Sequence, residues 1–520
     1  MAVMSGSPAF AQENPAPRTN AAPAPEPRFD ILEYVIDGNT VLTAEELEAA
    51  VYPFLGENRV AADVDRARDA LERLYRERGY QTVQVSIPRQ GVENKIIHFQ
   101  IVENPVGRLR VVDSKYHSLE EIKKIAPSLA EGTVPNLNAV QKDIVALNQQ
   151  ADMKVTPRLK AGAAPGTVDV DLQVEDKLPL HASIEINNQH NQQTTDLRTS
   201  ATVSYDNLWQ LGHSASFTYQ VAPRNPDDAQ VFSGSYLVRN PRSNWSFLVY
   251  GVKSDSAVAA LPTTDVIGKG TIVGGRAIVN FPGRDDFYHS LTLGIDRKDL
   301  SQNVITSGTP ADAPVLYYPL SISYAPTWND GAILTQINTS LNMAIPGIGS
   351  DSRKLDFQRF DAQRQYFYAK AALSRTQPLP WGMQLFGRFE GQIADGSLLS
   401  SEQMSAGGVN TVRGYLEAER LADNGLQSIL EVRSPALDSE SYPFVKDWRF
   451  SAFYDSAALW VNNPLPGEKD RFALASAGFG TRFGLLNVLT GSLDVAFPLV
   501  DGSATKAGDP RLHFRFSAGL

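Results

Sequence analysis

The chain has 520 residues, no cysteine and a formal net charge of −10. This length exceeds one ordinary hydrophobic core, so the chain must form several domains or one large closed sheet. The lack of cysteine excludes a disulfide framework, thiol catalysis and cysteine-ligated zinc, and the acidic balance argues against a nucleic-acid-binding protein. No apolar run reaches about 18 residues, so a membrane role would require a β-barrel.

The first 28 residues are expected to lie outside any folded core. Ala9-Phe10-Ala11 has the small-residue spacing of a secretory cleavage site, so residues 1–11 are interpreted as the remnant of a signal peptide, with an ordinary disordered N-terminus as the alternative. Residues 12–28 hold five prolines and almost no large apolar side chain, which predicts an extended linker.

Residues 29–105 are predicted to form an α+β module. Period-2 alternation of apolar residues predicts strands, whereas the Thr43–Glu46 capping box and an apolar stripe at helical spacing predict two helices. The resulting order is strand, helix, helix, strand, strand, with elements that start near Leu32, Thr43, Val64, Val83 and Ile97.

The same order repeats over residues 106–178, with elements that start near Arg108, Ser118, Asn136, Met153 and Thr167. Glycine and proline at 161–166 predict the hairpin between the last two strands. Two tandem modules of one topology indicate a modular arm rather than an enzyme with a central cleft.

Residues 179–520 are predicted to be a transmembrane antiparallel β-barrel. Segments of about 8–12 residues alternate apolar and polar side chains between turn residues, most clearly over 383–393 and at the C-terminus over 511–520. An apolar row opposite a charged row suits a wall between lipid and a wet lumen, and the length allows about sixteen strands. A large soluble β-sandwich array, which also alternates, is the alternative.

Six segments together resemble a known family, the TpsB transporters of two-partner secretion, also called hemolysin secretion/activation proteins. The carriers are LERLYRERGYQTVQVSIPRQ in the first module, IVALNQQADMKVTPRLKAGAAPGTVDVDLQVEDKLP in the second, and GGVNTVRGY, LEVRSP, FYDSA and GSLDVAFPL in the barrel. The resemblance implies two POTRA domains followed by a sixteen-stranded barrel. Many members also carry a helix ahead of the linker that plugs the lumen. No helical stripe precedes the linker here, so this helix is expected either to be absent or to have been lost by truncation of the sequence.

The resemblance further implies a specific contact inside the barrel. A lumen loop with Val412, Arg413, Gly414 and Tyr415 would fold back onto the wall, where the arginine meets Asp455 in a motif that begins at Phe453. A guanidinium binds a carboxylate bidentately, so one contact fixes position and orientation. Ala457 stands where the family commonly has glycine.

The function that the resemblance implies is export of one large, β-helical exoprotein from the periplasm to the cell surface, from an outer-membrane location. Free strand edges at 83–87 and 168–174 are the predicted client sites, with Tyr80, Val83, Val85, Ile87, Val168, Val170 and Leu172 as candidates. Further expected partners are outer-membrane lipid, periplasmic chaperones and the barrel-assembly machinery.

The alternatives are a general assembly factor for outer-membrane proteins, a passive porin or a barrel-borne enzyme. Because searches for nucleophile-elbow, zinc-protease and P-loop motifs find nothing in the sequence, no catalytic residue, cofactor or metal is predicted. The seven histidines show no metal-ligand spacing.

Overall fold

The computed structural model describes residues 27–520 except 92–93, 151, 241–242, 257, 261–264, 285, 307–308 and 438–443. Residues 1–26 lie outside the described residues. They contain the predicted signal remnant and nearly all of the predicted linker, and the expectation about a plug helix also concerns them. Within the described ranges, no helix has both the length and the apolar character needed to cross a bilayer.

The first module contains two helices and two small sheets. In chain order its elements are β1 (Phe29–Ile31), β2 (Glu33–Asp37), α1 (Ala44–Val51), η1 (Tyr52–Phe54), β3 (Gly56–Arg59), α2 (Ala61–Glu77), β4 (Gln84–Ser86) and β5 (Ile96–Val102). The main sheet has the order β2-β5-β4, with β2 parallel and β4 antiparallel to β5. The predicted capping box at Thr43 is confirmed, whereas the small β1–β3 sheet was not predicted.

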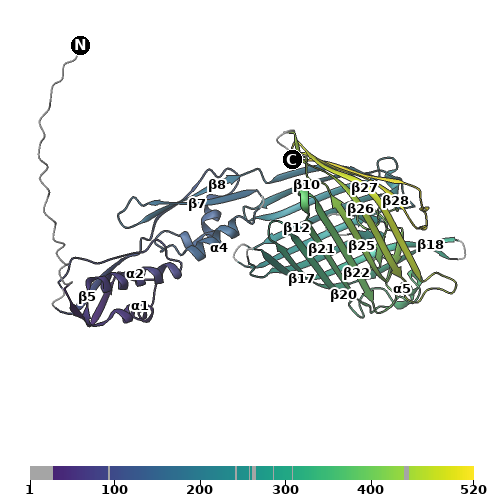
Figure 1. The fold of residues 1–520 in the computed structure, drawn as a ribbon. Coiled ribbons are helices and arrows are strands. Elements are labelled where there is room, and N and C mark those ends of the chain that lie inside the picture. The colour runs from purple at the N-terminus through teal and green to yellow at the C-terminus, as the bar shows by residue number, and fades with distance from the viewer. Residues whose placement is uncertain are drawn as a thin grey trace, which may run out of the picture. The chain divides into compact units, whose positions relative to one another are not determined.

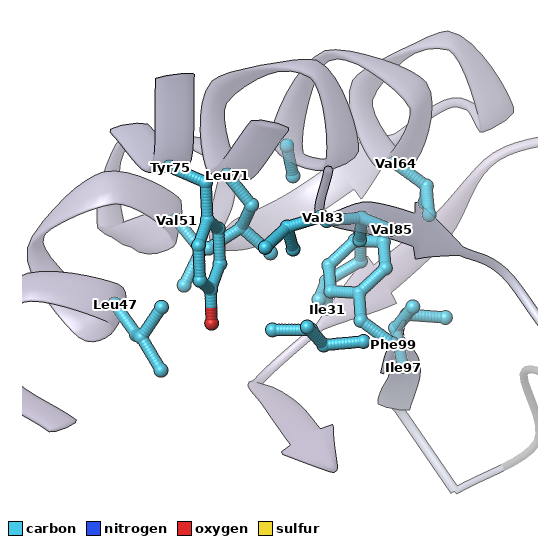
Figure 2. Packing of buried hydrophobic residues seen from close by; sticks show 12 residues of the cluster. Ile31, Leu47, Val51, Val64, Leu71, Tyr75, Val83, Val85, Ile97 and Phe99 are labelled. Atoms are coloured by element: carbon cyan, nitrogen blue, oxygen red, sulfur yellow. The ribbon is translucent and has the colours of Figure 1, made fainter. Parts of the chain in front are cut away.

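The core of this module lies between α2 and the main sheet. Figure 2 shows Leu71 and Tyr75 from α2 in the same buried cluster as Phe99 from β5, and all three side chains are fully buried. The Tyr34 ring stacks on Phe99 with centroids 5.2 Å apart, and the Tyr75 hydroxyl donates to Asn39 Oδ1 at 2.7 Å. The helical stripe and the strand alternation seen in the sequence therefore meet in one apolar layer.

Strand β4 is an edge strand that stops early. In its register, Ser86 faces Gln100, so residue 88 would face His98 next, but Pro88 has no N–H to donate to the ladder. The side chain of Gln90 takes that place: its Nε2 donates to the His98 carbonyl at 2.9 Å and its Oε1 accepts from the His98 amide at 2.7 Å. The open edge on the β4 side of this sheet is thereby limited to three residues.

The second module repeats the strand order of the first. Its elements are β6 (Val106–Val112), α3 (Leu119–Ile125), η2 (Pro127–Leu129), α4 (Leu137–Leu147), β7 (Met153–Ala161) and β8 (Val168–Asp176), and its sheet has the order β6-β8-β7. Asn136 caps α4, because its Oδ1 accepts from the amides of Asn138 and Ala139 at 3.1 and 3.3 Å.

The prediction that residues 168–174 form a free strand edge is wrong. Strand β8, which contains Val168, Val170 and Leu172, lies in the centre of its sheet, and the side chains of Val170 and Leu172 are fully buried. Asp171 bonds to both neighbouring strands: Arg110 of β6 donates to it at 2.9 Å, and Lys160 of β7 lies 2.5 Å from it. The free edges of this sheet belong to β6 and β7.

Asp176 at the end of β8 holds the segment that leads to α3. Its carboxylate accepts from the amides of Lys115, Tyr116 and His117 at 3.0, 2.8 and 3.2 Å. Burial alone would raise the pKa of Asp176, but these bonds, with those of the His117 and Ser114 side chains, outweigh it and hold the pKa below the usual 3.8.

We expect this contact to fail in acid. A carboxyl group whose pKa is lowered by folding stabilises the folded state above its unfolded pKa, and this contribution is lost as the pH falls below about 4. In Asp176→Asn the module should be less stable at pH 7 but should lose less stability on acidification. Amide hydrogen exchange of residues 111–125 at pH 7 and pH 3 measures both effects. An equal response to acid in the two proteins would contradict the assignment.

The rest of the chain forms a closed antiparallel barrel (Figure 1). The described part of its wall consists of β9 (Leu180–Asn187), β10 (Arg198–Leu208), β11 (His213–Val221), β12 (Gln230–Arg239), β13 (Trp245–Ser254), β16 (Lys269–Asn280), β17 (Phe287–Thr306), β18 (Thr309–Tyr317), β19 (Pro319–Asn329), β20 (Leu334–Ala344), β21 (Phe367–Pro378), β22 (Gln384–Ala394), β25 (Asn424–Arg433), β26 (Val445–Trp460), β27 (Arg471–Leu485), β28 (Leu489–Pro498) and β29 (Arg511–Gly519).

These segments make sixteen strands. β18 and β19 are separated only by Tyr318 and pair with β17 in one uninterrupted register, so together they form a single strand of the described wall. The last strand, β29, pairs with β9 and closes the barrel. The predicted fold class, α+β modules followed by an antiparallel barrel of about sixteen strands, is confirmed.

The barrel wall has the two faces that the alternation predicts. On β22, Phe389 and Ile393 are 50% and 69% exposed on the outer face, whereas Gln392 on the inner face is buried. Arg388 and Glu390, also on the inner face, form an ion pair at 2.7 Å. The smaller elements of this part are β14 (Val258–Ala260), β15 (Asp265–Ile267), α5 (Ser352–Gln358), η3 (Pro226–Asp228), η4 (Pro380–Gly382), β23 (Met404–Ala406) and β24 (Arg420–Ala422).

Candidate functional site

The segment between β22 and β25 folds into the barrel and carries the predicted loop motif. β23 and β24 pair as a short hairpin, and residues 407–419 between them form what we call the Arg413 loop. The Arg413 side chain is only 2% exposed and heads the described fully buried side chains in volume. A buried guanidinium requires acceptors around it, and the inner wall supplies them.

Asp455 on β26 is the main partner of Arg413. The outward neighbour Tyr454 is half exposed, so Asp455 faces the lumen, where it is fully buried. Arg413 Nε and a terminal nitrogen donate to the two carboxylate oxygens at 2.7 and 2.9 Å, and the Arg413 backbone amide donates to Oδ2 at 3.1 Å. This bidentate contact with an added main-chain bond fixes the loop in one orientation.

Two further carboxylates, which the sequence analysis did not assign, complete the site. The second terminal nitrogen of Arg413 donates to Glu431 of β25 at 3.0 Å and to Asp494 of β28 at 3.3 Å. Glu431 also binds Arg433, at 2.9 Å, and Arg482. Three guanidinium groups therefore face three carboxylates, which balances the charge of the cluster.

The predicted motif residue Phe453 lies beneath Arg413. The guanidinium carbon of Arg413 is 3.4 Å from the centre of the Phe453 ring, which adds a cation–π contact to the ion pairs. Ala457, at the position where glycine is common, is buried in the apolar cluster that contains Val412, so its methyl group is accommodated. Val412 itself is fully buried.

Gly414 and Tyr415 fix the other side of the loop. Gly414 has a φ of +91°, and a Cβ there would lie 3.2 Å from both Ala496 and Pro498 of β28, so the position requires glycine. The Tyr415 hydroxyl lies 2.9 Å from the Ala475 carbonyl and 2.6 Å from the Val500 carbonyl. The loop thus contacts the wall through three consecutive residues.

Gly414→Ala tests this close approach. We expect the substitution to undock the loop, because alanine is strained at a positive φ and its methyl group would press on β28. The strain is on the order of 1–3 kcal/mol, enough to raise protease cleavage of the loop in intact outer membranes. Gly467→Ala, at an open turn with a φ of +88° and no neighbour within 4 Å of an added Cβ, is the control for backbone strain alone. Equal cleavage in both variants would contradict a specific contact.

The end of the loop is bound by the last long turn of the barrel. Glu419 accepts from the amides of Leu416, Ala504 and Thr505 and from the Thr505 hydroxyl, at 2.7–3.0 Å. Burial alone would raise the pKa of Glu419, but these bonds outweigh it and the pKa lies below the usual 4.5. The loop is therefore anchored at its middle and at its end.

Two further buried polar clusters form around Glu402 and Asp423, which lie in the same segment between β22 and β25 and have partners on strands as well as loops. Glu402 accepts from Tyr317 and Tyr368 at 2.7 Å and pairs with Lys298 at 2.5 Å. Fully buried Asp423 accepts from the amides of Leu398 and Asn462 at 2.8 and 2.7 Å and so joins two further loops. Neither cluster was predicted, because its members lie far apart in the sequence and belong to no quoted motif.

One group of side chains has the composition of a metal site. Asp152, His181 and Asp206 place one ligand atom each within 4.8 Å of one another. His181 Nε2 lies 2.8 Å from Asp152 and 3.5 Å from Asp206, so a protonated imidazole already satisfies both carboxylates as an ion pair. The sequence analysis missed this group because its three members come from different segments.

Two family models match separate parts of the chain. Residues 29–104 match the ShlB-type POTRA domain, and residues 319–483 match the haemolysin secretion/activation protein ShlB/FhaC/HecB. The second match contains Arg413, Glu431 and Asp455. The chain is therefore similar to the haemolysin secretion/activation family in its first module and in its barrel. The resemblance seen in the motifs is thereby confirmed.

Comparisons over most of the chain agree with this similarity. The chain is 22% identical over 420 residues to the outer membrane transporter CdiB of Dickeya dadantii, covering 77% of this chain and 71% of that protein. It is 22% identical over 495 residues to the heme/hemopexin transporter protein HuxB of Haemophilus influenzae, covering 89% and 82%.

Solved structures share the fold. CdiB from Escherichia coli superposes with a TM-score of 0.68 at 18% identity, covering 97% of this chain and 93% of that one. BamA from Haemophilus ducreyi lacking POTRA domains 1–3 gives a TM-score of 0.55 at 15% identity, covering 95% and 100%. Together these matches identify the chain as an outer-membrane transporter for secreted exoproteins, with its N-terminal POTRA region in the periplasm.

Proposed function

We propose that this transporter binds one unfolded exoprotein through two POTRA domains and exports it through the barrel lumen to the cell surface. The observation that carries the proposal is the Arg413 loop, which is held against the inner wall by Asp455, Glu431 and Asp494. A loop bound inside a barrel can narrow the lumen at rest and can move aside when a chain passes.

The proposed domains are POTRA 1 at 29–105, POTRA 2 at 106–178 and the barrel at 179–520. Their common strand order, with the last strand in the centre of each sheet, supports the assignment of two modules of one kind. The family match covers only the first of them, so the second rests on this topology.

The client would add to POTRA sheets as an extra strand. The main chain of β4 is open on one side. In the second sheet β7 is an edge strand, so we assign to it the client contact that was predicted for β8. Val83 and Val85 are buried and hold β4 in place, whereas Ile87 is 36% exposed and Tyr80 half-buried, so these two remain available to a client side chain. Main-chain bonds would give binding with little demand on client sequence.

The proposed client is a large β-helical exoprotein of the TpsA type. The relatives are named as a transporter of heme/hemopexin and as an outer membrane transporter, which supports a dedicated cargo for this chain as well. Folding of the client outside the cell would drive export. Outer-membrane lipid around the barrel, periplasmic chaperones and the barrel-assembly machinery are the other proposed partners.

A general assembly factor for outer-membrane proteins is the second candidate function. The likeness of fold to BamA favours it, whereas two POTRA modules are fewer than such factors typically carry. A passive porin would have no need of the two periplasmic modules.

The proteomes of the culture medium and the outer membrane, compared with and without this gene, separate the candidates. Loss of a single large protein from the surface or the medium, with porins unchanged, is the expected result. A broad fall in many barrel proteins would instead establish the general assembly factor. Restoring the gene with a chain that lacks residues 29–105 should not restore export.

A further inference from the structure

The ladder that closes the barrel is the shortest in the described wall. β29 and β9 pair over five residues, from Arg515 opposite Asn187 to Gly519 opposite Ser183, whereas β29 pairs with β28 over eight. We call the β29–β9 ladder the seam. A ladder with few main-chain hydrogen bonds opens more readily than its neighbours. Any further contact that holds the two strands together therefore affects the stability of the seam.

Beyond the seam, β29 continues without a strand opposite it. The side chain of Asn188, just after β9, takes over the pairing: its Nδ2 donates to the Leu512 carbonyl at 2.7 Å, and its Oδ1 accepts from the Phe514 amide at 2.9 Å. One amide side chain thus replaces a strand at this end of the ladder.

The Arg413 loop contacts both sides of the seam. On the β29 side, the Gly414 amide donates to His513 Nε2 at 2.8 Å, and Arg511 Nε donates to the Gly414 carbonyl at 3.3 Å. On the other side, the Glu417 amide donates to the carbonyl of His190, which lies three residues after the end of β9. Only Tyr415 and Leu416 separate Gly414 from Glu417, so a short stretch of the loop connects β29 with the segment that follows β9.

We propose that the Arg413 loop is a brace across the seam, and that His513 is the positioning residue that couples loop docking to seam closure. The inference concerns the barrel alone and does not depend on the client or on the direction of transport. Release of the loop from the wall would then weaken the seam in the same event.

The chemistry of the His513 contact is unambiguous. A backbone amide can only donate, so Nε2 of His513 must carry no proton and the imidazole must be neutral, with its proton on Nδ1. His513 is 4% exposed, and Gly414 is wedged against Ala496 and Pro498, so neither partner can shift to find a replacement. The contact therefore requires a hydrogen-bond acceptor at the position that His513 Nε2 occupies.

Three substitutions at one position test the coupling. The amide oxygen of glutamine can take the place of Nε2, the shorter side chain of asparagine cannot reach that place, and leucine has no acceptor. Amide hydrogen exchange of the full chain in lipid nanodiscs is measured for residues 183–187 and 515–519. Exchange at the seam should be about tenfold faster in His513→Asn and His513→Leu and unchanged in His513→Gln. The β27–β28 ladder should be unchanged in all three.

A disulfide across the seam distinguishes a loop that holds the seam closed from a general loss of barrel stability. The chain has no cysteine, so the pair I184C/A518C, at directly opposite positions of the seam, forms the only disulfide. In His513→Asn the locked seam should regain slow exchange while the loop stays sensitive to protease.

Two outcomes would overturn the proposal. One is wild-type exchange at the seam in His513→Asn although the loop is cleaved. The other is faster exchange that extends equally to the β27–β28 ladder.

Discussion

Replacing Arg413 with alanine is expected to undock the loop and to abolish most export, while the barrel remains assembled in the outer membrane. The substitution leaves Asp455 and Asp494 buried without their cation, and breaking a buried ion pair in this way costs about 3–5 kcal/mol. That cost falls on the docked state of the loop, because the ladders of the wall do not use the Arg413 side chain. We expect protease to cut within residues 407–419 and the exoprotein to disappear from the medium.

Matched variants make this result specific. Arg413→Lys keeps the charge but loses the bidentate fork, and Asp455→Asn keeps the shape but loses the charge, so both should impair export less than Arg413→Ala but in the same direction. Arg388→Ala removes a lumen arginine whose one ion-pair partner among the described residues is Glu390, and export by this variant should be normal. Heat-dependent migration of the folded barrel confirms assembly in each case. Wild-type export by Arg413→Ala, or an effect of only one member of the Arg413–Asp455 pair, would remove the role assigned to the contact.

Phe99→Ala is expected to unfold the first POTRA module without affecting the barrel. Phe99 is fully buried and stacks on Tyr34, and truncation of such a ring costs about 3–5 kcal/mol of unfolding free energy. That loss is a large fraction of the stability of a small module. Pulse proteolysis of the full chain in increasing urea should show cleavage within residues 29–105 at much lower denaturant.

The control for Phe99→Ala lies in the same module, at the residue between β1 and β2. Leu32 is 64% exposed, so Leu32→Ala should change the unfolding free energy by less than about 0.5 kcal/mol. Loss of the folded barrel band in Phe99→Ala would contradict the expected independence of the module. Equal urea sensitivity of the two variants would contradict the packing described for Phe99.

The sequence predicted the elements of the fold well and their arrangement less well. Periodicity placed α2 and β5 because a helix stripe and a strand alternation are local features. The order of strands in a sheet is not local, and for this reason β8 was expected at an edge although it lies between β6 and β7. Residues 168–174 alternate apolar and polar side chains, which predicts a strand with one buried face but does not distinguish a central strand from an edge strand.

The candidate site was predicted in part. The family motif led to Arg413 and Asp455, but Glu431 and Asp494 were overlooked although the quoted motifs LEVRSP and GSLDVAFPL contain them. Each is a lone acidic residue on a strand whose neighbours face outward, as Leu430 and Val495 do. The alternation along the strands near β26 places both side chains on the inner face of the barrel, and this pattern would have identified them. The loop clusters around Glu402 and Asp423 depend on tertiary folding and had no comparable signal.

The location of the acceptors for the Arg413 loop has a consequence for the timing of biogenesis. Asp494 follows Arg413 by 81 residues, and His513 follows Gly414 by 99. A growing chain therefore contains the loop long before the strands that receive it. Until β28 and β29 have joined the wall, the guanidinium lacks part of its counter-charge and the Gly414 peptide has no acceptor. Insertion of the loop is thus a late checkpoint, and a protease-resistant loop reports that the C-terminal strand is in place.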